Sequence, residues 1–326
     1  MFGFLLSRAG FAVITILLAS VLNFLLISLP PGDYIARLEA QQSRQSGVVT
    51  KLEYVRVRYG LDKPIIVQYW KWITGFVQGD LGLSMKYETE VSDLVGGRLV
   101  LSLILSTATL LFTWAVAIPI GVYVAVRKYG LADNILTIVG FIGLALPNFL
   151  LALLLVYISL FWFDAKSVGG LFSREFRDAA WSFARVWDLM QHLWIPVIVI
   201  GTAGTAGLIR IMRTNLLETF GEMYILTARA KGLRERTVVW KHAVRVAINP
   251  LISILGMSLP FIIGGEIIVS IVLNLPTLGP LFYEALLLQD MYLAGGILMI
   301  LTLLLVIGNF LADLLLVWSD PRIKFS

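Results

Sequence analysis

The sequence has no cysteine among its 326 residues and only two histidines, His192 and His242, which lie far apart. The lack of cysteine excludes disulfides, thiol catalysis and cysteine-ligated metal sites. Two isolated histidines are a poor basis for a zinc site or a catalytic histidine. We therefore expect this chain to bind no metal and no cofactor of its own.

Charge is also scarce, since 14% of the residues are charged, 58% are hydrophobic and the mean hydropathy is +0.86. Soluble domains do not have this balance, so most of the chain is expected to lie in lipid. The net charge is +5. Because the basic residues flank apolar runs instead of alternating with exposed aromatics, nucleic-acid binding is not expected.

Enzyme signatures are missing as well. The sequence contains no Gly-x-x-x-x-Gly-Lys-Ser/Thr phosphate-binding loop, so any ATP must be bound by another chain. It contains no recognisable Ser/His/Asp set or catalytic carboxylate pair either. We expect a protein that is not an enzyme.

Long apolar runs dominate what is present. They lack the two-residue alternation of a barrel strand, so they predict an all-α membrane protein with six transmembrane helices. Arg127, Lys128 and the basic residues of 210–245 mark the cytoplasmic side, which places both termini of this multi-pass chain in the cytoplasm. The predicted helices are 9–29, 99–126, 135–162, 193–212, 247–273 and 293–318.

These helices predict three parts: an N-terminal transmembrane helix (1–29), an extracytoplasmic cap (30–98) and a core of five transmembrane helices (99–326). In the cap, Asp62-Lys63-Pro64 is a typical helix start, and apolar residues follow at helical spacing. We expect a folded insertion that rests on the membrane, because its apolar face is rich in Trp and Tyr.

The cytoplasmic loop at about 214–246 does not have the composition of a loop. Residues 222–231 favour helix, Gly232 is a plausible stop, and 234–246 predicts a second helix. Two short helices joined at a glycine would form a rigid projection below the membrane. A projection of this kind can transmit a displacement from a partner protein to the transmembrane helices.

In this loop, Thr227-Ala228-Arg229-Ala230-Lys231-Gly232-Leu233 resembles the "EAA" coupling loop of ABC importer permeases of the oligopeptide, dipeptide and nickel group. Leu226 stands at the usual glutamate position, and His242-Ala243-Val244-Arg245 resembles that group's His-Ala-Leu-Arg. Other short strings stand in the same order as in the group: 29–33, 59–64, 79–82, 275–279 and 320–322.

The resemblance implies a permease subunit in a bacterial cytoplasmic (inner) membrane that forms half of a translocation pathway. The implied partners are a second related permease, two cytoplasmic ATPases that hold ATP and Mg, an extracytoplasmic binding protein and the lipid bilayer. Peptides are the expected cargo, with nickel chelates, sugars or opines as alternatives. The implied coupling residues are Glu222, Thr227, Ala228, Arg229, Ala230, Lys231, Gly232, Leu233 and Arg234.

Glu266 is an ionisable residue inside a predicted span, and such residues are candidates for function. Ser270 lies four positions later, on the same helical face, where the family usually has a glutamate. Both are candidates for the translocation path, and a structural pairing of Glu266 with a neighbouring helix is the alternative. A different class, an ion-driven secondary transporter, would be expected to show inverted repeats and several intramembrane ionisable groups.

Overall fold

The computed structural model describes residues 2–28, 57–60, 62–163 and 169–319. Within these ranges the chain is mostly helical, and an isolated bridge between Leu83 and Glu90 is its one β-type pairing. The predicted all-α class is confirmed for this part of the chain. The motif strings at 29–33 and 320–322 and the first part of the predicted cap lie outside the described residues.

The chain forms two compact units. Unit 1 comprises Met1–Ser102 and Thr277–Val306, and unit 2 comprises Leu103–Pro276 and Ile307–Ser326. Two long helices, α5 (Val91–Val126) and α15 (Met291–Ser319), begin in unit 1 and end in unit 2.

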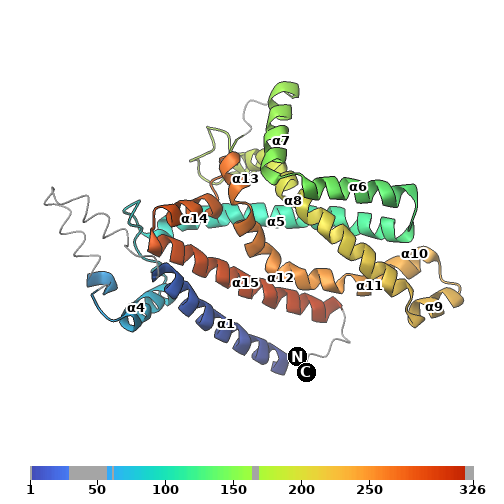
Figure 1. Cartoon of the computed structure of the whole chain (residues 1–326), viewed down its shortest axis with the longest axis horizontal. Helices are drawn as coiled ribbons and strands as arrows, with labels where there is room; N and C mark the ends of the chain where they lie inside the picture. Colours follow the sequence, from blue (N-terminus) through green and yellow to red (C-terminus); the bar gives the residue numbers. More distant parts are fainter. Residues whose placement is uncertain (1, 29–56, 61, 164–168, 320–326) are drawn as a thin grey trace. The chain divides into compact units, whose positions relative to one another are not determined.

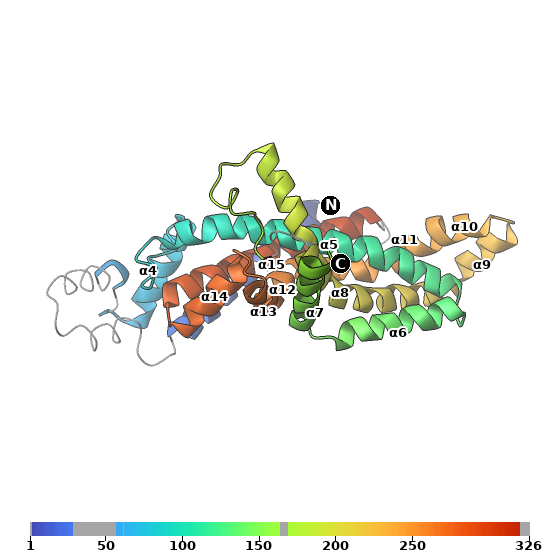
Figure 2. The same ribbon diagram turned by 90° about the horizontal axis from the view of Figure 1, so that it is seen from above.

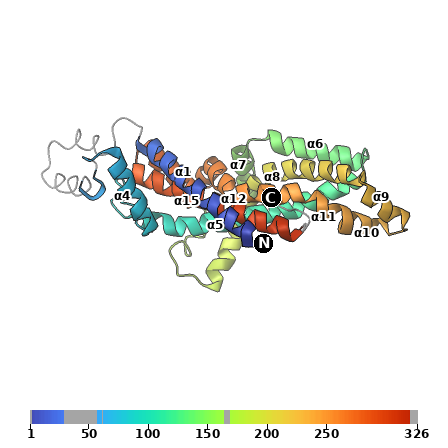
Figure 3. The ribbon, with the colours of Figure 1, turned by 90° about the horizontal axis from the view of Figure 1, so that it is seen from below.

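Unit 1 also contains α1 (Phe2–Ser28), α4 (Ile65–Val77) and α14 (Leu278–Leu287). Figures 1 and 3 show α4 beside the C-terminal end of α1. The ring of Phe24 lies 5.7 Å from that of Trp72, and the Ser20 and Tyr69 hydroxyls are 2.8 Å apart. Pro64 occupies the N-cap of α4, which confirms the helix start predicted for the cap.

Unit 2 carries the predicted coupling loop. Its first helices are α6 (Leu131–Ala145), α7 (Asn148–Trp162) and α8 (Phe183–Phe220). The loop region follows as α9 (Met223–Ala230), α10 (Glu235–Thr237), the π-helix η1 (Val238–Ala243) and α11 (Val244–Ala247), and the unit continues with α12 (Asn249–Gly265) and α13 (Ile267–Val272). Figures 1 and 2 show α9 and α10 at one end of this unit, past the start of α6.

Four described helical segments are long and apolar enough to cross a membrane: Ser7–Leu26, Val91–Val126, Phe183–Phe220 and Met291–Trp318. They correspond to four of the predicted spans, although α5 and α8 extend beyond the predicted limits. The segments predicted at 135–162 and 247–273 are each divided. The total of six spans therefore stays a prediction.

At each division the backbone departs from the helical conformation. Leu146 adopts an extended conformation (ψ 124°) because it precedes Pro147. Helix α7 then begins at Asn148. The expected helix over 135–162 is thus two helices. In the later segment, Glu266 has φ −92° and ψ 4° and separates α12 from α13.

Candidate coupling site

The coupling segment, residues 222–247, begins where α8 ends at Phe220. Gly221 caps α8, and Glu222 occupies the N-cap of α9 with an extended backbone (ψ 141°). The carbonyl of Glu222 accepts hydrogen bonds from the amides of Ile225 (3.0 Å) and Leu226 (3.2 Å). The chain therefore starts a new helix after only two residues.

One face of α9 is buried against the rest of unit 2. Ile225 is fully buried and Ala228 is nearly so, and both belong to a cluster with Leu216 of α8 and Val238 and Val239 of η1. The segment has two limbs, α9 and the helical stretch Glu235–Ala247. The small side chain of Ala228 lets these limbs approach closely. The predicted coupling residue Ala228 is thus part of the core that fixes the segment's shape.

The turn between the limbs is a Schellman motif, in which two amides after the helix bond back to its last carbonyls. The amide of Leu233 donates to the carbonyl of Ala228 (3.3 Å), and that of Gly232 donates to Arg229 (2.9 Å). Gly232 has φ +73°, a left-handed conformation that side chains disfavour, and a Cβ there would meet no heavy atom within 4 Å. The glycine is needed for its backbone conformation and not for space.

An ion pair closes this turn. The guanidinium of Arg229 donates to both carboxylate oxygens of Glu235, at 2.6 and 3.2 Å, and lies 5.3 Å from the ring centre of Phe220. Their hydrogen bonding raises the pKa of Arg229 and lowers the pKa of Glu235. Arg229 therefore ties α9 to both α10 and the end of α8.

We expect Glu235→Gln to change the free energy of unfolding by less than about 1 kcal/mol, because the pair is largely exposed. The pKa of Glu235 is lower in the folded chain, so the pair stabilises above the unfolded pKa and loses this contribution as pH falls through the folded value. Thermal unfolding of wild type and variant in detergent, at a series of falling pH values, measures the contribution of the pair to stability. A difference that is large, or that grows at low pH, would contradict the assignment.

The second limb leads into the transmembrane part of unit 2. Val238, Val239, Ala243 and Ala247 are buried. The helical stretch Glu235–Ala247 then bends by 46° into Asn249–Ser258, next to Pro250, which cannot donate a helical hydrogen bond. The segment is thus packed on α8 at one end and continuous with α12 at the other.

The outward surface of the segment holds most of the predicted coupling residues. Glu222, Thr227, Ala230, Lys231, Gly232, Leu233 and Arg234 are exposed, together with the apolar Met223 and Leu226. This surface mixes basic and apolar groups around the turn. It can accept a partner protein that offers acidic groups and an apolar contact, and the role itself stays a prediction.

The two candidate translocation residues lie at the division between α12 and α13. Glu266 and Ser270 are both buried, and the amide of Ser270 donates to the carbonyl of Glu266 (2.8 Å). Within the described residues, the carboxylate of Glu266 has no hydrogen-bond partner. The structure brings the pair one helical turn apart, as the spacing predicts, and their contact with cargo stays a prediction.

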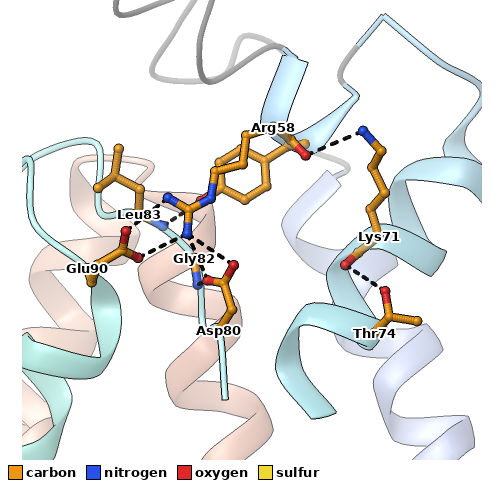
Figure 4. A network of polar contacts seen from close by, with 8 residues as sticks. Arg58, Lys71, Thr74, Asp80, Gly82, Leu83 and Glu90 are labelled. Atoms are coloured by element: carbon orange, nitrogen blue, oxygen red, sulfur yellow. Dashed lines mark hydrogen bonds and ion pairs between the residues drawn. The ribbon is translucent and has the colours of Figure 1, made fainter. Parts of the chain in front are cut away.

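In unit 1 the structure reveals a network centred on Arg58 that sequence reasoning missed (Figure 4). Arg58 donates to Asp80 at 3.0 and 3.1 Å and to Glu90 at 2.9 and 3.2 Å. These bonds, first that to Glu90, raise its pKa. The amide of Leu83 donates to the hydroxyl of Tyr59 (2.6 Å), and burial raises the pKa of that tyrosine to about 12. No local pattern joins positions so far apart in sequence.

Truncating Arg58 should loosen this part of the cap. Arg58→Ala leaves two facing carboxylates without their shared cation, so we expect a local loss of about 2 kcal/mol. That corresponds to roughly 30-fold faster hydrogen exchange at the amides of Gly82 and Leu83 in the full chain. Lys63→Ala, an exposed charge outside the network, is the control. Unchanged exchange in Arg58→Ala would show that the network does not hold the loop.

The chain is similar to known membrane transport proteins along most of its length. Residues 117–325 match the family described as "Binding-protein-dependent transport system inner membrane component", and residues 1–106 match its N-terminal part. The oligopeptide transport system permease protein AppB of Bacillus subtilis is 35% identical over 100% of both chains. The dipeptide transport system permease protein DppB of Escherichia coli K12 is 30% identical over 99% of both. The glutathione transport system permease protein GsiC of Pectobacterium atrosepticum is 31% identical over 100% of both.

Proposed function

Because the chain belongs to the family of inner membrane components of binding-protein-dependent transport systems, we propose that it forms half of the translocation pathway of an ATP-driven peptide importer. The observation that carries this proposal is the coupling segment, which joins an exposed turn to two transmembrane elements. The full-length likeness to permeases named for oligopeptides, dipeptides and glutathione favours di- or oligopeptides as cargo.

The proposed topology has six passages, with α6–α7 and α12–α13 each serving as one divided passage. Both termini and the coupling segment face the cytoplasm, because the basic residues around Arg127 and 210–245 are concentrated there. The cap lies outside. The proposed partners are a second permease, a binding protein and two ATPases that carry ATP and Mg.

The proposed coupling is mechanical. An ATPase that binds the outward surface of the coupling segment moves the turn at Gly232 when it closes. Since α9 is packed on α8 through Ile225 and the second limb continues into α12, both helices receive the displacement. Their movement switches access to a path beside Glu266 and Ser270 from one side of the membrane to the other.

The test is ATP hydrolysis by the reconstituted assembly of this chain, its paired permease, two ATPases and the binding protein. Binding protein loaded from a peptide library should raise hydrolysis above the level with empty binding protein. Nickel chelates, sugars and opines serve as competing cargos. Stimulation by one of these alone would replace the peptide assignment, and a lack of association with any ATPase would overturn the importer assignment.

A further inference from the structure

A cavity of about 330 Å³ lies within unit 2 between α6, α8 and the turn that follows α5. Polar side chains line one part of it, and apolar groups of α6 and α8 line the rest. The polar members are Tyr129, Asp133, Asn134, Arg210 and Arg213. The cavity is separate from the coupling segment and from Glu266, so the proposed importer mechanism does not use it.

One of its cations is held rigidly. The buried carboxylate of Asp133 accepts from Arg213 at 2.8 and 3.2 Å and from the amide of Tyr129 at 2.9 Å. Such a paired carboxylate fixes the guanidinium plane and neutralises its charge.

The other cation, Arg210, is exposed and has no hydrogen-bond or ion-pair partner in the described part of the chain. Arg127 and Lys128 in the adjoining turn stack over Tyr123 and Tyr129 and add two more positive charges. Asp133, already paired, is the one acidic residue that lines the cavity. The site is therefore positive and has a guanidinium free to bind an anion.

An apolar stripe also runs along α6, on a face of the helix other than the one that lines the cavity. Leu131, Ile135, Ile138, Val139 and Ile142 are between 54% and 81% exposed. Their spacing places them along one side of the helix. A positive cavity in a helix pair with an apolar outer surface suits a phospholipid, which carries an anionic phosphate and apolar acyl chains.

We propose that this cavity binds the headgroup phosphate of an anionic phospholipid, with Arg210 as the principal cation. Arginine suits the role because its planar guanidinium forms paired hydrogen bonds with phosphate. Basic pockets between transmembrane helices bind anionic headgroups in this manner.

Native mass spectrometry of the full chain tests the proposal, with phosphatidylglycerol, phosphatidylcholine or inorganic phosphate added at equal concentration. Phosphatidylglycerol should be retained preferentially, and Arg210→Gln should weaken that retention about fivefold, the value for one basic residue at an anionic surface. Arg210→Glu should abolish the preference. Lys63→Gln makes the same change of charge far from the cavity in sequence and should change nothing.

Equal retention by wild type and Arg210→Gln would overturn the assignment, and so would equal binding of phosphatidylglycerol and phosphatidylcholine. Displacement of the lipid by inorganic phosphate would identify a site for a soluble anion instead. Loss of lipid when the paired permease is added would identify a protein interface. Because Arg210 is exposed, the variants should fold as the wild type does.

Discussion

Gly232→Pro should abolish the stimulation of ATP hydrolysis by loaded binding protein while the chain still inserts and assembles. Proline fixes φ near −65°, whereas this position has φ +73°, and it removes the amide that bonds to the carbonyl of Arg229. The cost of at least about 3 kcal/mol lowers the native turn's population by more than a hundredfold. We expect stimulated hydrolysis to fall at least about tenfold, because the displaced turn no longer moves α8 and α12 together.

Gly232→Asn is the matched control, since asparagine tolerates the left-handed conformation and can replace glycine at this position of a helix end. The space around Gly232 is open, so the added side chain should cause no clash. The control should keep most of the stimulation. Equal activity of the proline variant and the wild type would show that the shape of the turn plays no part in coupling.

Gly256→Leu should prevent unit 2 from folding. A Cβ at Gly256 of α12 would lie 2.7 Å from the Cα and 2.9 Å from the amide nitrogen of Asn309 in α15. Backbone atoms cannot move aside as the end of a flexible side chain can. Overpacking of this kind costs about 3 kcal/mol or more. We expect little monodisperse protein in size-exclusion chromatography after detergent extraction.

Gly264→Leu in the same helix is the control, because a Cβ there meets nothing within 4 Å. It replaces glycine by a strong helix former and should leave the yield unchanged or slightly higher. A normal melting temperature for Gly256→Leu would mean that α12 and the end of α15 do not pack closely.

Local signals accounted for several elements. Pro64 predicted the start of α4, and Gly232 predicted the end of α9, because proline and glycine restrict or extend backbone conformation wherever they stand. The order of residues 227–233, together with short strings elsewhere along the chain, predicted the family. Hydropathy predicted one span over 135–162, because it counts apolar residues and does not register the extended residue that a proline requires.

The missed features depend on contacts between distant residues. Glu235 closes the coupling turn, but its position in sequence resembles any charged residue of a loop. Asp133 and Arg213 meet across two helices, and Arg58 joins Asp80 to Glu90. Charge pairs of this kind follow from the tertiary fold, which hydrophobic periodicity alone does not specify.

The central claim is that this chain carries peptides in a system driven by ATP. It is tested most directly by uptake of a labelled di- or oligopeptide into vesicles containing the full assembly, with the binding protein outside and ATP inside. The account predicts accumulation that requires ATP and persists when ionophores collapse the ion gradients. Accumulation by this chain alone, without ATP and abolished by ionophores, would contradict it and identify a secondary transporter.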